Sequence, residues 1–146
     1  MYDVLFAPSR EEYGDEVASD IECVFCSIRD EDPQVWTREI YRDGTSIVIM
    51  NVYPYSPGHI QVLPRRHLET PADLSEDELF HSSAIIQRGI ELTDEALDPD
   101  GWNVGLNIGE AGASISHLHF QIVPRYEDER EEDQEEIHEM LLENKE

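Results

Sequence analysis

Short apolar stretches separated by turn residues predict an antiparallel sheet. Five such stretches lie along the chain, at residues 35–42, 45–52, 59–63, 102–108 and 117–123. The first two flank Asp43-Gly44, a strong signal for a two-residue hairpin turn. A turn rich in proline and glycine, residues 53–58, precedes the third stretch, and a glycine-rich loop, residues 109–114, joins the last two.

One segment, residues 75–97, has the period of a long helix. Ser75 and Glu78 match a capping box at its start, and Asp98-Pro99 ends it. One stripe at helical spacing consists of Leu79, Ser83, Ile86, Ile90, Thr93 and Leu97. Because the strands cluster as hairpins around this one helix instead of alternating with helices, we predict the α+β class with an antiparallel sheet.

The two ends of the chain have a different pattern from its middle. The predicted parts are an N-terminal arm (residues 1–22), a single domain (residues 23–126) and an acidic C-terminal tail (residues 127–146). Eleven of the twenty tail residues are Asp or Glu, a composition typical of disorder. A short helix from Asp133 onward, burying Ile137, Met140 and Leu141, is the other interpretation of the tail.

The charge of the chain excludes several classes of partner. Among 146 residues, 34 are acidic and 10 are basic, which gives a formal net charge of −24. A field this negative repels nucleic-acid phosphates and anionic lipids, so neither is an expected partner. No apolar stretch approaches the roughly 20 residues that a bilayer requires, and the N-terminus lacks a secretion signal, so we expect a soluble cytoplasmic protein. Acids dispersed over a folded surface also indicate a halophilic source, because molar salt screens charges within about 3 Å.

The strand at residues 117–123 alternates strictly between two kinds of side chain. His117, His119 and Gln121 share one face, with about 7 Å between neighbours, while apolar residues at 118, 120 and 122 share the other. The apolar face belongs to the core. A polar, solvent-facing strand would also explain the opposite face. Two histidines and a glutamine in register, in a chain with only six histidines, nevertheless favour a chemical site.

The loop before this strand offers groups that suit a phosphate. Asn107 and Ser114 supply a carboxamide and a hydroxyl, and Gly109 and Gly112 allow close approach of the backbone. Taken alone, these residues are explained better by an ordinary glycine-rich hairpin turn. The arginines at positions 65, 66 and 125 are among the few positive charges that would offset the acidic field near an anionic substrate.

Cys23 and Cys26 have the spacing of a metal knuckle, and two further ligands would close a tetrahedral zinc site. His67 and His117 are candidates to complete that site. The alternatives are a redox pair, a disulfide or two small buried residues. A redox pair would be expected inside a βαβ pattern, which the sequence lacks.

Taken together, four stretches resemble the histidine-triad (HIT) family of nucleotide hydrolases and transferases. In chain order they are CVFCSI at residues 23–28, NVYPYSPGHIQVLPRRH at 51–67, GWNVGLNIG at 101–109 and HLHFQIVPR at 117–125. The resemblance covers residues 23–126, most of the chain. The segment LFAPSR at residues 5–10 also resembles the branch that acts on diadenosine polyphosphates.

The resemblance implies a fold, an assembly and a mechanism. The fold is a five-stranded antiparallel half-barrel sheet with one long helix and a short terminal helix, and a homodimer joins two such sheets. His119 would attack the α-phosphorus and hold the nucleoside monophosphate as a phosphoramidate. Backbone N–H groups near Ser114 and His119, with Asn107, would stabilise the phosphoryl oxygens. Asn51 resembles the position that meets the ribose, and His59 resembles a histidine that supports the nucleophile.

One departure from the family's hydrolases concerns the reaction. Gln121 stands where most of them have histidine, and glutamine can donate a hydrogen bond to a phosphoryl oxygen but cannot carry a proton. The pattern His-x-His-x-Gln resembles the transferase branch, which includes hexose-1-phosphate uridylyltransferases and dinucleoside-polyphosphate phosphorylases. The zinc ligands of the zinc-containing uridylyltransferases match Cys23, Cys26, His67 and His117, which implies a structural Zn²⁺ and a structural role for His117.

Length discriminates within that branch. The uridylyltransferases join two copies of the fold, and 146 residues hold one, so the sequence favours a small dinucleoside-polyphosphate hydrolase or phosphorylase that acts as a dimer. Ala113 replaces a glutamine that helps several hydrolases bind phosphate, which leaves the position of the leaving group open. The alternatives are a nucleoside phosphoramidate hydrolase, a zinc-stabilised nucleotide-binding module with little turnover, and an acidic tail that docks a partner.

Overall fold

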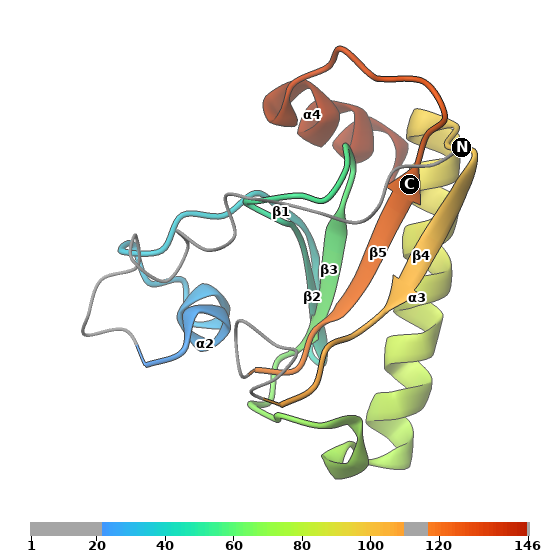
Figure 1. Ribbon diagram of the computed structural model, residues 1–146. Coiled ribbons are helices and arrows are strands. Elements are labelled where there is room, and N and C mark those ends of the chain that lie inside the picture. The colour runs from blue at the N-terminus through green and yellow to red at the C-terminus, as the bar shows by residue number, and fades with distance from the viewer. Residues whose placement is uncertain (1–21, 110–116, 146) are drawn as a thin grey trace.

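The computed structural model describes residues 22–109 and 117–145 (Figure 1). The described helices are α2 (Val24–Arg29), α3 (Glu76–Leu97) and α4 (Gln134–Asn144), with a 3-10 turn, η2 (Pro71–Asp73). The strands are β1 (Glu39–Arg42), β2 (Ser46–Met50), β3 (Ile60–Pro64), β4 (Gly101–Gly105) and β5 (Phe120–Arg125). Of the expected N-terminal arm, only Glu22 falls within the described ranges.

The five strands form one antiparallel sheet in the order β1-β2-β3-β5-β4, which confirms the predicted α+β class. The β1–β2 hairpin turns at Asp43-Gly44, as the sequence predicts. Asp43 stabilises the turn, because its Oδ1 accepts hydrogen bonds of 2.8 Å from the N–H groups of both Thr45 and Ser46. Figure 1 shows α3 along one face of the sheet and α2 beside the opposite face.

Each face of the sheet has an apolar cluster. The larger cluster lies between the sheet and helices α3 and α4, and its buried members include Ile60, Val62, Phe120 and Ile122. The smaller cluster packs α2 against the other face, and its members are Val24, Phe25, Ile28, Ile47, Ile49 and Leu63. Side chains of alternate residues along β3 and β5 therefore belong to different layers of the molecule.

Both longer helices begin at capping boxes. In α3, Ser75 and Glu78 satisfy each other's backbone N–H groups, as predicted. In α4, Asp133 and Glu136 do the same. Among residues 22–109 and 117–145, no helix is both long enough and apolar enough to cross a lipid bilayer.

The buried face of α3 differs from the predicted stripe. Its buried residues are Ser82, Ile85, Gly89, Thr93 and Leu97. Leu79 is 50% exposed, and Ile86 and Ile90 are only half-buried. Gly89 gives the physical reason, because a Cβ atom there would lie 2.5 Å from Cδ1 of Ile122. The helix lies closest to the sheet at a residue without a side chain, which a count of apolar positions passes over.

The tail contains an ordered helix, so disorder is the wrong interpretation for its described part. Ile137 and Leu141 lie four residues apart on α4, and both are fully buried in the larger cluster. Met140 is half-buried and packs against the same cluster. The predicted short helix is therefore confirmed, because burial of this apolar stripe outweighs the repulsion among the acids around it.

Three strands differ by three or more residues from their predicted limits, and the first of them, β1, begins at Glu39 instead of residue 35. β5 begins at Phe120 instead of His117, because the preceding backbone bonds elsewhere: the Leu118 N–H donates to the Leu68 carbonyl at 2.6 Å. β4 ends at Gly105, so residues 106–108 leave the sheet. The histidine-rich segment thus approaches the sheet from a loop, which allows His117 and His119 different surroundings.

Candidate functional site

Polar side chains of β3 and β5 occupy the sheet face on the side of α2. Residues 60, 62, 120 and 122 pack into the cluster beneath α3, so their neighbours point the other way. The polar residues among these neighbours are His59, Gln61, His119 and Gln121, of which the two histidines directly precede β3 and β5. All four are buried, with no more than 6% of any residue exposed. The solvent-facing strand that the sequence allowed is therefore excluded.

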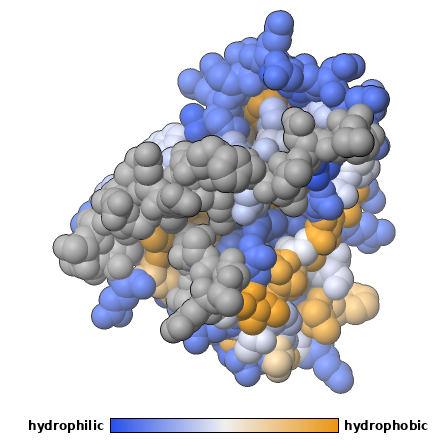
Figure 2. Space-filling model, viewed as in Figure 1, coloured by the Kyte–Doolittle hydropathy of each residue, from blue (hydrophilic) through white to orange (hydrophobic). Residues whose placement is uncertain are grey.

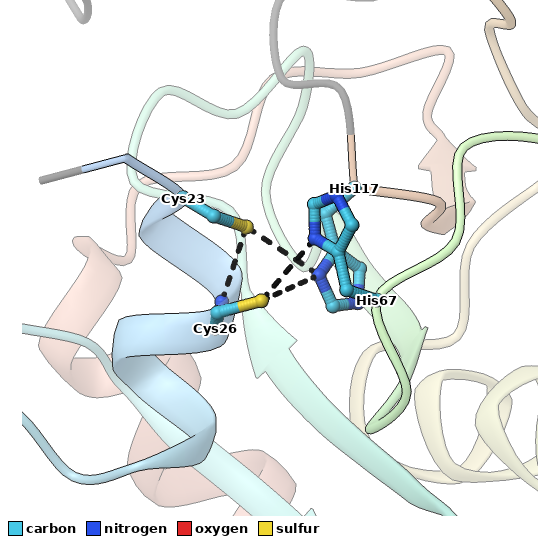
Figure 3. A group of neighbouring side chains, drawn as sticks. All are labelled: Cys23, Cys26, His67 and His117. Atoms are coloured by element: carbon cyan, nitrogen blue, oxygen red, sulfur yellow. Dashed lines mark hydrogen bonds between the residues drawn. The ribbon is translucent and has the colours of Figure 1, made fainter.

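Four predicted metal ligands, Cys23, Cys26, His67 and His117, converge beside this face (Figure 3). Their ligand atoms all lie within 4.8 Å of one another. Sγ of Cys26 is 3.2 Å from Nδ1 of His67 and 3.5 Å from Nδ1 of His117. Sγ of Cys23 is also 3.5 Å from Nδ1 of His117. Both cysteines are free thiols, so the disulfide alternative is not formed.

The geometry of this cluster suits a tetrahedral zinc ion. With Zn–S near 2.3 Å and Zn–N near 2.0–2.1 Å, a tetrahedron separates sulfur and nitrogen ligands by about 3.5 Å. The three S···N distances of 3.2–3.5 Å match that value. Nε2 of His117 lies 2.8 Å from the Pro64 carbonyl oxygen, which accepts a hydrogen bond from the Nε2–H group. In this tautomer the lone pair is on Nδ1, which faces the thiols.

Protonation of the cluster follows from burial. Burial lowers the pKa of His117 to about 4, so the ring is neutral near pH 7, the form in which imidazole binds a metal. Burial, together with the adjacent Cys23 thiol, raises the pKa of Cys26 to about 11. Coordination deprotonates a thiol outright, so metal loading at this cluster would release protons.

His119, the predicted nucleophile, lies directly beside the metal cluster. Its Nδ1 is 2.9 Å from the His117 carbonyl oxygen, and an N–H donated there fixes the tautomer. The lone pair of the neutral ring is then on Nε2. Phe25 of α2 contacts both rings edge-on, with its centroid 4.9 Å from that of His119 and 5.8 Å from that of His117. The same short helix therefore supports the ligands and the candidate nucleophile.

Asn51 and His59 meet where β2 ends and β3 begins. The Asn51 N–H donates to the His59 carbonyl at 3.0 Å, and Nδ2 of Asn51 lies 3.4 Å from Nε2 of His59. Nδ1 of His59 accepts a 3.0 Å hydrogen bond from the Tyr55 N–H, and the two rings stack. Gln134 of α4 donates a 3.0 Å hydrogen bond to the Asn51 carbonyl. No local pattern in the acidic tail predicts this role of Gln134, because its partner Asn51 lies 83 residues away in the sequence.

The expected phosphate-binding residues are less completely assembled. Gln121 pairs with Gly105 of β4, and its buried Oε1 has no partner among the described residues. Asn107 follows β4 and is exposed. Ser114 lies outside the described residues. The arginines at positions 65, 66 and 125 donate hydrogen bonds to the Asp43 carbonyl, Glu78 and Asn103, so part of each guanidinium is engaged in the fold.

Comparisons with known proteins agree with this arrangement. A family model described as HIT domain matches residues 32–128. Over 101 residues the chain is 38% identical to an AP-4-A phosphorylase of Mycobacterium tuberculosis, a match that covers 66% of this chain and 52% of that protein. Over 92 residues it is 28% identical to an asymmetrical bis(5'-nucleosyl)-tetraphosphatase of Schizosaccharomyces pombe, covering 62% and 50%. The chain thus spans about half the length of these curated relatives.

A solved structure resembles the whole described fold. It is a zinc-bound histidine triad family protein from Mycobacterium smegmatis, with a TM-score of 0.75 and 29% sequence identity. The match covers 85% of this chain and 93% of that one. The described fold thus occurs in a protein of this kind that holds zinc, the metal that the Cys and His donors fit here.

Proposed function

The chain belongs to the HIT family, and from that premise we propose that it transfers a nucleotidyl group from a dinucleoside polyphosphate through a covalent nucleotidyl-His119 intermediate. The observation that carries this proposal is the environment of His119, which is buried with Nδ1 directed at the His117 carbonyl. A neutral imidazole with its lone pair on Nε2 is a competent nucleophile near pH 7. Both curated relatives are named for reactions on dinucleoside polyphosphates.

The proposed reaction has two displacements at one phosphorus atom. In the first, Nε2 of His119 forms an N–P bond to the α-phosphorus, and the P–O bond to the rest of the polyphosphate breaks with its electron pair on the departing nucleotide. In the second, an oxygen of the acceptor attacks the same phosphorus, the N–P bond breaks, and the imidazole returns to its neutral form. The His117 carbonyl stabilises the positive ring of the intermediate through the Nδ1–H bond.

Gln121 determines which acceptor, water or inorganic phosphate, is favoured in the second displacement. An attacking water molecule must lose a proton, and glutamine cannot receive one. An inorganic phosphate dianion already carries a nucleophilic oxygen, so it needs only hydrogen-bond donors. We therefore propose phosphorolysis over hydrolysis.

Product analysis with diadenosine tetraphosphate tests the acceptor. Molar KCl is the medium, because it screens the net charge of −24. We expect ADP and ATP only when inorganic phosphate is present. In Gln121→His, whose side chain can accept a proton, we expect AMP and ATP to form without phosphate. Formation of AMP and ATP by the wild-type protein without phosphate would show that Gln121 does not exclude water.

We further propose that Cys23, Cys26, His67 and His117 hold a structural zinc ion. The donor set and the S···N distances support this assignment. When bound, the ion would cross-link α2 to the segments that follow β3 and precede β5, with all four positions filled by protein. His119 itself is tied to this cluster through the His117 backbone and Phe25.

The exposed edge of the sheet supports a homodimer, which we propose as the working assembly. β4 is the terminal strand next to β5, and no strand of the described chain pairs with its outer side. Leu79, Val104 and Ile108 are each about half exposed, at 50%, 46% and 51%. Figure 2 shows hydrophobic surface along the side where β4 and α3 lie. An apolar edge strand is a template for pairing with a second strand, and a two-fold axis satisfies both copies.

Val104→Asp is expected to weaken dimerisation by about 100-fold or more, because each copy would bury an unpaired carboxylate. Sedimentation velocity over a concentration series in molar KCl measures the change. Val104→Thr keeps the size and branching of the side chain and is expected to remain dimeric. A wild-type protein that sediments as a monomer throughout the series would exclude this assembly.

A further inference from the structure

Two buried glutamines lie side by side at the centre of the candidate site. The strand register pairs Gln61 of β3 with Gln121 of β5. The same row continues to Ile49 of β2 on one side and to Gly105 of β4 on the other. Residues opposite each other in an antiparallel pair have side chains about 5 Å apart. The two amides are therefore neighbours on the face that also holds His119.

Neither of these amides makes a hydrogen bond within the described residues. Gln61 is 4% exposed and Gln121 is 6% exposed. Oε1 of Gln121 is buried and has no hydrogen-bond partner among the described residues. The hydrogen bonds of the described residues include none from the Gln61 side chain. A buried polar group without a partner destabilises a folded protein, so each one requires an explanation. Ile49 and Leu63 show that apolar side chains fit this face on either side of Gln61.

The row of amides lies between the two ends of the site that a nucleotide would span. The neighbouring row on one side contains Asn51 and His59, whose backbones are bonded at 3.0 Å. On the other side lies His119, two residues before Gln121. Alternate residues of a strand are about 7 Å apart. A nucleotide with its ribose at Asn51 and its α-phosphorus at His119 therefore passes over Gln61 and Gln121.

The part of the ligand that passes over this row offers only hydrogen-bond acceptors. It consists of the 5'-oxygen and the oxygens of the phosphoryl group, and a glutamine amide supplies two N–H donors for them. At one end of the row, Ile49 packs in the apolar cluster with side chains of α2. At the other end, a Cβ on Gly105 would meet no described atom within 4 Å, which leaves space beside Gln121. The chemistry of the row thus matches a phosphoryl group more closely than a nucleobase.

We propose that Gln61 is a further substrate-binding residue, whose Nε2–H donates to a 5'-phosphate oxygen of the bound nucleotide beside Gln121. This role rests on the proposed nucleotidyl transfer. A side chain of the sheet itself would then bind the 5'-phosphate. This role also explains why a buried amide interrupts the apolar pattern of β3.

The test compares AMP and adenosine binding by calorimetry in the wild type and in Gln61→Met, a near-isostere without donors. We expect the affinity for AMP to fall by about 10-fold, because a hydrogen bond to a charged group is lost. The affinity for adenosine is expected to change by less than 2-fold. The melting temperature of the unliganded variant is expected to equal or exceed that of the wild type, since no hydrogen bond within the described residues is lost.

Ile49→Val is the matched control, because it changes the same row without altering any polar group. It is expected to lower the melting temperature while leaving the ratio of AMP to adenosine affinity unchanged. A lower melting temperature in Gln61→Met with unchanged AMP affinity would assign the amide a structural role and overturn the proposal. A wild-type protein that binds no AMP would overturn the proposed function as well. Because this measurement uses the wild-type protein alone, failure of the proposed function is distinguished from failure of the role of Gln61.

Discussion

His119→Ala is expected to abolish the covalent intermediate and to lower turnover of diadenosine tetraphosphate by about 10⁴-fold or more, as removal of a nucleophile does in other covalent enzymes. In the proposed mechanism, the Nδ1 atom of this ring donates to the His117 carbonyl, and Nε2 is the nitrogen that attacks phosphorus. Substrate labelled at the α-phosphorus, quenched during turnover, measures the nucleotidyl groups bound per chain.

His138→Ala is the matched control for this substitution. His138 is a half-buried histidine that, like the buried His119, has a ring nitrogen 2.9 Å from a carbonyl oxygen, here that of Glu39, but it lies on α4. It is expected to retain labelling, and AMP binding by His119→Ala checks that the site remains folded. Labelling of His119→Ala at the wild-type level would contradict the mechanism. A wild-type protein that binds AMP and is never labelled would be a nucleotide-binding module instead.

Local sequence pattern predicts the elements of this fold better than it predicts how they pack. The Asp43-Gly44 turn and the Ser75 capping box depend on residues within four positions of each other, and both are present as predicted. The buried face of α3 depends instead on Gly89 meeting Ile122, a contact between distant residues that apolar periodicity does not encode. For the tail, the sequence left disorder and a short helix both open for a similar reason, since its acids are visible in the composition while the burial of Ile137 depends on the core it joins.

The candidate site follows the same division. The spacing of Cys23 and Cys26 suggests a metal, but their partners lie 41 and 91 residues away from Cys26, and only the tertiary fold brings them within reach. Strand alternation places Gln121 on the face of His119. It could not reveal Gln61 as its neighbour, because that pairing depends on the register between β3 and β5. Residues that act across strands or from the far end of the chain are the ones that sequence patterns miss.

Removal of the metal is expected to be the other large effect. Cys26→Ser should lose zinc and lower the melting temperature by about 10 °C or more, because the ion contributes its binding free energy to folding. Metal analysis by mass spectrometry and thermal unfolding measure the two effects. Ser27→Ala is the control, since it lies on the same turn of α2 and supplies no ligand atom. It should keep both the metal and the stability.

A chelator distinguishes the effect of metal loss from other effects of the Cys26→Ser substitution. Chelation of the wild-type protein should reproduce the lowered melting temperature, and chelation of Cys26→Ser should lower it no further. Turnover should fall with the metal in both cases, because Phe25 of α2 contacts the ring of His119, and the proposed ion would fix α2 in place. An active, stable protein with almost no metal per chain would show that packing of Val24, Phe25 and Ile28 against the sheet suffices to hold α2. The nucleophile would then be positioned by the apolar cluster alone.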